Sequence, residues 1–207
     1  MSLFGTNMAL SETNYLILND LFAYPILIPL QSSCEQYIKP IHFRVECYRI
    51  MATFCFFSAV LPPEIGQLTS LTQLWLIDLQ LDTLPSDIGN LTRLQKLSVR
   101  SNHLLFLPNT FADLVSLQWL HLAENCLTEL PYRFGTLKHL AFLNLDSNRF
   151  TVIPECLGTL PSLTTLSMRN NRIRQLPDKL VLAFSRLSKL DLRDTEIENS
   201  PERWKVV

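Results

Sequence analysis

The hydrophobic positions of the chain repeat every 23 residues from residue 71 onward. Each line follows the pattern Leu-x-x-Leu-x-Leu-x-x-Asn-x-Leu-x-x-Leu-Pro-x-x-Ile-x-x-Leu. Successive lines begin at Leu71, Leu94, Leu117, Leu140 and Leu163, and a sixth begins at Leu187 after one extra residue. Self-similarity at a period of roughly 20 to 30 residues is typical of a solenoid, in which each repeat contacts only its neighbours.

Prolines and glycines follow the same period as the leucines. The regularly spaced prolines are Pro62, Pro85, Pro108, Pro131, Pro154 and Pro177. The regularly spaced glycines are Gly66, Gly89, Gly135 and Gly158, and Ala112 fills the missing slot. Proline fixes φ and favours extended backbone in the residue before it, so each Leu-Pro pair predicts the start of a return segment.

Each line also predicts one short strand. Leu120 and Leu122 alternate with other residues, and this period of two is typical of a strand with one buried face. Asn125 then follows, and an asparagine side chain can hydrogen-bond neighbouring backbone and turn the chain. Because no line can bury its leucines alone, the stacked lines should form one continuous core beside one curved parallel sheet.

The pattern closely resembles the leucine-rich repeat family over roughly residues 61–204. It is most similar to the 23-residue intracellular type found in Ras-pathway scaffolds, plant cytosolic proteins and bacterial effectors. The resemblance implies an α/β fold, a right-handed solenoid or horseshoe with a concave parallel β-sheet. It also implies that the asparagines stack into a ladder. The asparagines concerned are Asn102, Asn125, Asn148 and Asn171. Since Leu79 and Thr195 replace asparagine in the first and last lines, we expect the ladder to stop at both.

Residues 1–60 do not follow the repeat and predict a mostly helical N-terminal cap. An apolar stripe near the helical period predicts a helix over residues 40–58, and Ser11 and Glu12 can start another helix that runs through Tyr15 and Leu18 to Phe22. Such a cap would cover the open end of the first repeat, as a solenoid requires. The predicted domains are therefore the cap, 1–60, and the solenoid, 61–207, with about six repeats of which the first and last are incomplete.

Composition narrows the class of function. The formal charge is -1, from 18 basic and 19 acidic side chains, which argues against nucleic acid as a partner. Five cysteines without regular spacing favour a reducing compartment, so we expect a cytoplasmic protein. The first basic residue is Lys39, which does not fit a secretory signal, and the longest apolar runs are too short to cross a bilayer.

No motif in the chain specifies a reaction. We find no glycine-rich phosphate loop, no nucleophile elbow and no paired-histidine metal motif. Cys34, His42, Cys47 and Cys55 are near one another in the sequence, but their spacing does not match a common zinc site. We therefore expect no metal, no cofactor and no enzymatic activity.

The concave face, formed by the outward positions of the strands, carries the candidate binding residues. Trp75, Trp119 and Phe142 point away from the predicted core with His121 between them, and tryptophan is enriched in binding hot spots. Charged neighbours of alternating sign resemble a polar rim that sets specificity. The candidate partner-binding residues are Trp75, Arg100, Trp119, His121, Phe142, Asn144, Asp146, Arg169, Asp191 and Arg193.

These observations predict a non-catalytic module whose concave face docks a globular protein partner. The family resemblance implies a scaffold or adaptor, or an inhibitor that covers an enzyme's active site; it also leaves open a bacterial effector delivered to the host cytosol. Two alternatives remain: the recognition part of an enzyme system such as ubiquitin ligation, or a membrane-surface protein that uses its apolar N-terminal head. The identity of the partner and the oligomeric state stay open at this point.

Overall fold

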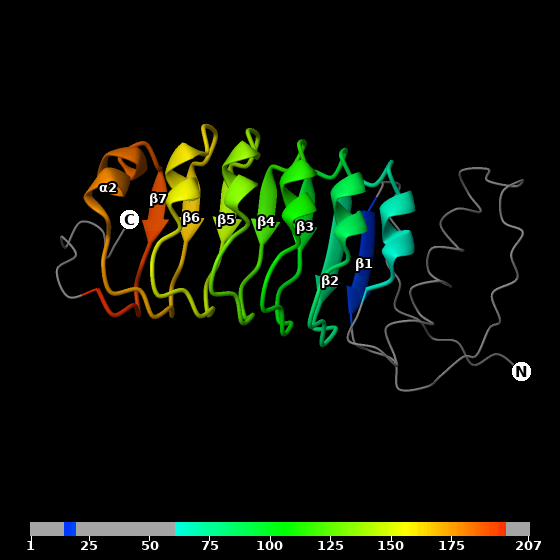
Figure 1. The fold of residues 1–207 in the computed structure, drawn as a ribbon, viewed down its shortest axis with the longest axis horizontal. Helices are drawn as coiled ribbons and strands as arrows, with labels where there is room; N and C mark the ends of the chain where they lie inside the picture. The colour runs from blue at the N-terminus through cyan, green and yellow to red at the C-terminus, as the bar shows by residue number, and fades with distance from the viewer. Residues whose placement is uncertain (1–14, 20–60, 198–207) are drawn as a thin grey trace, which may run out of the picture.

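A computed structural model describes residues 15–19 and 61–197 of the chain. Seven parallel strands lie side by side in chain order in one sheet (Figure 1). The strands are β1 (Tyr15–Asn19), β2 (Gln73–Ile77), β3 (Lys96–Ser98), β4 (Trp119–His121), β5 (Phe142–Asn144), β6 (Thr165–Ser167) and β7 (Lys189–Asp191). The architecture is the α/β solenoid with a concave parallel sheet that the repeat predicts.

A row of short helices carries the chain back between strands. Five of them are single 3₁₀ segments, η1 (Pro63–Gln67), η2 (Ser86–Asn90), η3 (Asn109–Asp113), η4 (Tyr132–Thr136) and η5 (Glu155–Thr159). Each begins directly after one of the regularly spaced prolines, whose extended backbone turns the chain into the return segment. The last return segment is instead an α-helix, α2 (Asp178–Phe184), in the line that has one extra residue.

The core lies between the sheet and the row of helices. The leucines at the fourth position of each line are paired in register from strand to strand, as Leu97 pairs with Leu120 and Leu120 with Leu143, and these side chains are fully buried. Phe111 and Phe134 stack within the same core at a ring-centroid distance of 6.3 Å. Burying side chains of this size stabilises the fold by about 1.5–3 kcal/mol each relative to exposure.

The predicted asparagine ladder is present and runs along the core. The side-chain oxygen of Asn125 accepts a hydrogen bond from the Leu104 amide of the preceding repeat at 3.0 Å. Its amide nitrogen donates to three backbone carbonyls, one of which, that of Val99, belongs to the preceding repeat. Equivalent bonds are made by Asn102, Asn148 and Asn171. Each asparagine therefore joins two repeats through buried backbone groups that would otherwise lack partners.

At the two ends of the ladder another residue takes the asparagine slot, and the ladder stops there as predicted. Leu79 takes the asparagine slot of the first full line and is buried in the core, while its amide donates to the side-chain oxygen of Asn102. Thr195 takes the slot in the last line and donates to the carbonyl of Leu192, three residues before it. Thr195 thus reproduces one of the bonds made within a repeat by the asparagines.

A left-handed residue follows each of the six strands β2 to β7. The eighth position of every line has a φ between 51° and 59°, although none of these residues is glycine. They are Asp78, Ser101, Glu124, Ser147, Asn170 and Asp194. Left-handed backbone costs about 1 kcal/mol or more for most residues, and short polar side chains adopt it most readily. The asparagine bonds to the carbonyls just before these residues hold this turn in place.

The predicted helical cap over residues 1–60 lies outside the described residues, except for β1. There the prediction was wrong: Tyr15–Asn19 form a strand, whereas a helix was expected through Tyr15 and Leu18. Leu16 and Leu18 are in register with Leu74 and Leu76 of β2, so this segment repeats the apolar alternation of the other strands. A short apolar run fits a strand as well as a helix, and pairing with β2 selects the strand. The predicted helix at 40–58 also lies outside the described residues.

Replacement of Asn125 by alanine should destabilise the protein by about 2–4 kcal/mol, because the Leu104 amide and several buried carbonyls lose their partner. Chemical denaturation monitored by circular dichroism would measure the change. The matched control is Asn109→Ala at the exposed first residue of η3, which should change stability by less than about 0.5 kcal/mol. Equal effects at the two positions would show that the ladder is not a main source of stability.

Candidate functional site

The strand geometry places the third and fifth residues of each line on the concave face, while the fourth residue enters the core. In β4 and β5 the outer residues are half-buried and the central leucine is fully buried. Since the strands are parallel and in register, residues from the same position of neighbouring lines lie next to one another. The concave face is therefore built from columns of side chains about 4.8 Å apart.

Four of the predicted binding residues form one aromatic cluster on this face: Trp75, Trp119, His121 and Phe142. Trp119 lies at its centre. Its ring centroid is 5.3 Å from that of Phe142, with the two planes only 10° apart. Trp75 and His121 contact Trp119 in tilted arrangements at 5.2 and 5.6 Å. Aromatic pairs at such distances contribute about 0.5–1.5 kcal/mol beyond simple burial.

The rings of this aromatic cluster are half-buried rather than fully exposed. The sequence places them in neighbouring columns but gives no measure of how far they cover one another. By contrast, Tyr132 on η4 is 80% exposed and Phe106 is 51% exposed, so the largest exposed apolar side chains lie away from the concave face. The aromatic cluster is therefore a preformed platform whose rings already pack together and keep part of their surface accessible.

His121 sits beside Trp119 in an environment that favours the neutral imidazole. Burial lowers its pKa below the ordinary value of 6.5, and the nearby positive charge of Arg100 lowers it further. Its Nδ1 atom is buried and has no hydrogen-bond partner among the described residues. Protonation would turn this nitrogen into a buried donor without an acceptor, which is unfavourable. The aromatic cluster is thus uncharged at neutral pH.

Arg100 is held at the edge of the aromatic cluster by Glu124. The guanidinium of Arg100 donates two hydrogen bonds to one oxygen of the Glu124 carboxylate, at 2.6 and 3.1 Å. The hydroxyl of Ser101 donates to the other oxygen at 2.7 Å. The Ser101 hydrogen bond, together with Arg100, lowers the pKa of Glu124. Arg100 therefore reaches the concave face as one half of an ion pair.

Asp146 organises the neighbouring part of the face. One of its carboxylate oxygens accepts a hydrogen bond from the Ser167 hydroxyl at 2.6 Å and another from the Arg169 amide at 2.7 Å. The side-chain oxygen of Asn144 accepts from the Asp146 amide at 2.8 Å. Arg169 in turn donates to Asp194 at 3.2 Å. These predicted binding residues form one connected polar network.

Asp191 differs from the expectation for an outward binding residue, because it is buried, with only 5% of its surface exposed. The guanidinium and amide of Arg193 donate to its carboxylate, and the side-chain hydrogen bond from Arg193 lowers its pKa. The neighbouring fifth-position residues Ser98 and Ser167 are buried as well. Three of the six fifth-position residues are therefore buried, whereas the residues of the aromatic cluster stay partly accessible.

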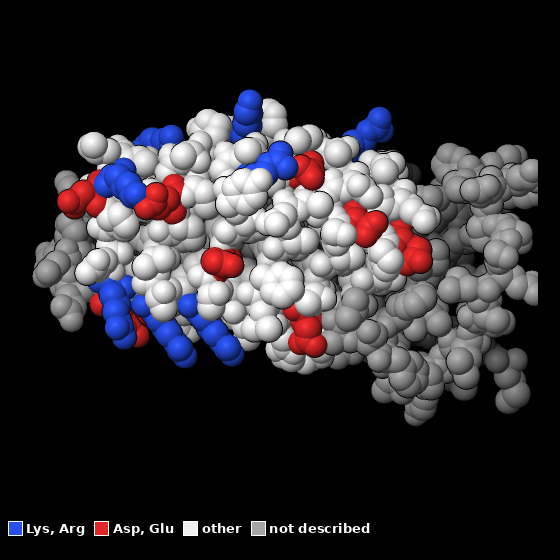
Figure 2. Space-filling model, viewed as in Figure 1, with Lys and Arg blue, Asp and Glu red and all other residues white. Residues whose placement is uncertain are grey.

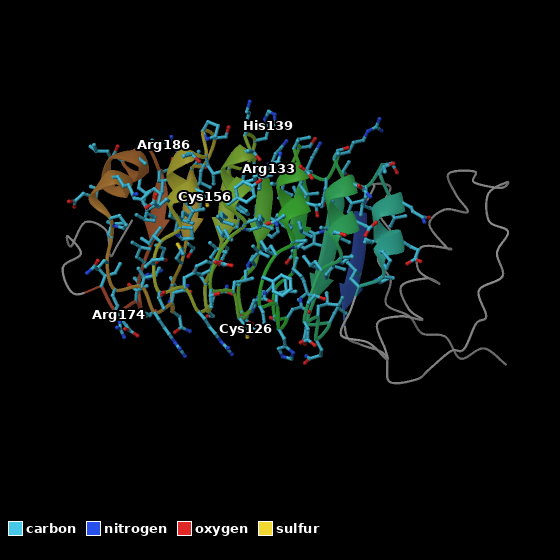
Figure 3. All side chains as sticks on the ribbon, viewed as in Figure 1. Cys126, Arg133, His139, Cys156, Arg174 and Arg186 are labelled. Carbon is cyan, nitrogen blue, oxygen red and sulfur yellow. The ribbon has the colours of Figure 1, made fainter. Side chains whose placement is uncertain are left out.

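The described residues include no group of three or more histidine, cysteine, aspartate or glutamate side chains placed to hold a metal ion. The possible cluster of Cys34, His42, Cys47 and Cys55 lies outside them. Cys126 and Cys156 are free thiols on different sides of the solenoid (Figure 3). Burial raises the pKa of the Cys156 thiol, which keeps it protonated and poorly nucleophilic at neutral pH.

A hollow on the helical side lies between η4, η5 and α2, and its lining includes Tyr132, Cys156 and Lys179. Lys179 forms an ion pair with Glu155 across it. The repeat pattern gives no sign of this hollow, whose lining comes from two 3₁₀ segments and from α2. No helix within the described ranges, 15–19 and 61–197, is long and apolar enough to cross a membrane.

The lowered pKa of His121 predicts a dependence of stability on pH. Because the folded protein binds a proton less readily than the unfolded chain, the free energy of unfolding should rise with pH up to about 6.5 and then level off. NMR titration should find the His121 pKa below 6.5, and Arg100→Gln should raise it by removing a nearby positive charge. A His121 pKa at or above 6.5 in the wild-type protein would contradict this view of the site.

Two models of known protein families match the amino-acid sequence and support the same fold. A family model described as leucine rich repeat matches residues 92–150, and a second, described as two copies of leucine rich repeats, matches residues 138–182. A search of curated proteins gives no match. The 23-residue intracellular subtype stays a prediction.

Solved structures give the same fold. The chain is similar to the leucine-rich-repeat ectodomain of the receptor kinase GASSHO1/SCHENGEN3 from Arabidopsis thaliana, in complex with CASPARIAN STRIP INTEGRITY FACTOR 2, with 28% identity, a TM-score of 0.57 and coverage of 66% of this chain and 17% of that one. The Toll–Spatzle complex of Drosophila gives 27% identity, a TM-score of 0.58 and coverage of 67% and 20%.

An internalin from Listeria monocytogenes shares the fold at 22% identity, with a TM-score of 0.56 and coverage of 70% of this chain and 48% of that one. The chain thus spans less than half the length of each of these three structures.

The matched repeats, the asparagine ladder and the parallel solenoid lead to one conclusion. The chain is a leucine-rich repeat protein.

Proposed function

We propose that this chain is a non-catalytic binding module whose concave face docks a globular protein partner. The observation that carries the proposal is the aromatic cluster. It gathers Trp75, Trp119, His121 and Phe142 on one face of the sheet, with Trp119 in contact with the other three rings. Clustered aromatic side chains that remain partly accessible are the usual centre of a protein-binding hot spot.

The rigidity of the supporting sheet favours binding further. Short strands, each tied to its neighbours by an asparagine, hold the aromatic cluster in one arrangement before a partner arrives. Binding to a preformed surface loses little conformational entropy, so more of the contact energy appears as affinity. The stacking of Trp119 on Phe142 also fixes the orientation of both rings in the free protein.

The polar residues around the aromatic cluster would set specificity more than affinity. Arg100 pairs with Glu124, Arg169 with Asp194, and Arg193 with Asp191. Each predicted binding arginine is already paired with an acidic side chain. These arginines therefore do not form a patch of uniform positive charge that would attract a highly charged protein. A partner that buries the aromatic cluster and forms hydrogen bonds with the surrounding pairs suits this surface best.

Two of the similar structures are complexes. The plant receptor ectodomain is bound to CASPARIAN STRIP INTEGRITY FACTOR 2, and Toll is in complex with Spatzle. Both identities exceed one quarter, and this likeness supports a protein or peptide partner here as well. We propose a scaffold or adaptor role, or inhibition by covering an enzyme's active site. The irregularly spaced cysteines favour the cytoplasm as the location, and an effector role in a host cytosol belongs to the same proposal. We also propose that the chain divides into a cap, 1–60, and a solenoid, 61–207.

A Trp119→Ala, Phe142→Ala double variant should lose the partner. Each truncation at a hot spot costs about 2 kcal/mol or more, so retention in affinity capture from cytosol, quantified by mass spectrometry, should fall by at least about 30-fold. The control is Tyr132→Ala on the helical side, where the ring is 80% exposed. Circular dichroism would verify the fold of each variant.

The two outcomes are distinct. A protein retained by the wild type and by Tyr132→Ala, and lost by the double variant, supports recognition through the concave face. Identical capture by all three proteins contradicts it and directs attention to the N-terminal residues 1–60, the alternative site, which lie mostly outside the described residues.

A further inference from the structure

The edge of the solenoid that follows the strands carries two adjacent arginines, Arg149 and Arg172. They occupy the same slot of neighbouring lines, and both are exposed. The backbone fixes their proximity: the amide of Phe150, the residue after Arg149, donates to the side chain of Asn171, the residue before Arg172, at 3.1 Å. The two arginines therefore leave the backbone about one strand spacing apart, roughly 4.8 Å.

A third arginine, Arg174, extends this group. Ile173 between Arg172 and Arg174 is fully buried, so the alternation of extended backbone turns both arginines outward. Figure 2 shows basic side chains projecting together from this lower edge, near the end of the solenoid that holds β5 to β7. Figure 3 labels Arg174 at the same edge. We call Arg149, Arg172 and Arg174 the edge arginines.

Two of the edge arginines, Arg149 and Arg172, differ from the arginines of the concave face because they form no ion pair within the described residues. Arg100, Arg169 and Arg193 each form an ion pair. Within residues 61–197, no acidic side chain lies within ion-pair distance of Arg149 or Arg172. Two like charges in neighbouring repeats repel each other, and an anion bound between them replaces that repulsion with charge-assisted hydrogen bonds.

We propose that the edge arginines bind the phosphate group of a phosphorylated side chain on a protein partner. A phosphomonoester carries a charge of about -1.5 to -2 and three acceptor oxygens, so it can accept hydrogen bonds from two guanidinium groups at once. A single carboxylate matches one guanidinium fork and leaves the second charge uncompensated. This site is separate from the aromatic cluster and does not depend on the proposed function of the concave face.

The chemistry favours a phosphorylated protein over an anionic membrane. Recognition of anionic lipid typically uses clusters of about four to eight basic residues, each contributing about 1 kcal/mol. Here the group consists of three arginines, and Arg174 is already paired with Glu196 at 2.9 Å. A compact site of this size matches one phosphate group rather than an extended charged surface.

The test uses the full chain and a blocked glycyl-phosphoseryl-glycine peptide, with the unphosphorylated peptide as the reference. NMR titration should shift the Nε–Hε resonances of Arg149 and Arg172 with the phosphopeptide alone. An Arg149→Gln, Arg172→Gln double variant should raise the Kd at least about tenfold, because it removes the charge-assisted hydrogen bonds. Arg93→Gln, an exposed arginine elsewhere on the solenoid, should leave the Kd within about twofold.

A variant with the opposite effect separates specific binding from simple loss of charge. Glu196→Gln removes a carboxylate that competes for Arg174, so it should lower the Kd for the phosphopeptide by about threefold. The proposal is overturned by three results: no shift at Arg149 and Arg172, an equal loss of affinity in Arg93→Gln, or tighter binding of phosphatidylserine vesicles than of the phosphopeptide through the same arginines.

Discussion

The buried asparagine of the four central repeats makes the interactions on which the rest of the structure depends. Leucine burial is non-directional and would permit neighbouring repeats to slide, whereas the hydrogen bonds of Asn125 to Leu104 and Val99 fix one register. The same side chain closes the turn that follows its own strand, through the carbonyls of Leu122 and Ala123. Stacking and turning are thus specified by one residue type at one slot.

The functional surface follows from this constraint. Each of the strands β3 to β7 has three residues, and its first and last residues, the third and fifth positions of the line, face outward from the sheet. Side chains at these positions meet their equivalents one strand away, and Trp119 therefore stacks on Phe142. The left-handed residues at the eighth position direct the polar rim, including Glu124, towards the same face.

The sequence predicted the features that repeat and missed those that occur once. The period of 23 residues was sufficient to predict the strands of the repeats, the core leucines and the ladder, because the same residue type recurs at the same position of several repeats. The strand Tyr15–Asn19 lies outside that period, and a short apolar run does not distinguish a strand from a helix. The burial of Asp191 depends on a bond to Arg193 that no pattern reveals. The packing of the aromatic cluster likewise depends on ring orientation, which spacing leaves undetermined.

The central claim is that a protein partner covers the aromatic cluster. The most direct measurement is oxidative footprinting of the wild-type protein with and without its captured partner, read by mass spectrometry at each aromatic residue. The account predicts that the partner protects Trp75, Trp119 and Phe142 from oxidation and leaves Tyr132, on the helical side, unprotected. Protection of Tyr132 with unchanged oxidation of Trp119 would contradict it.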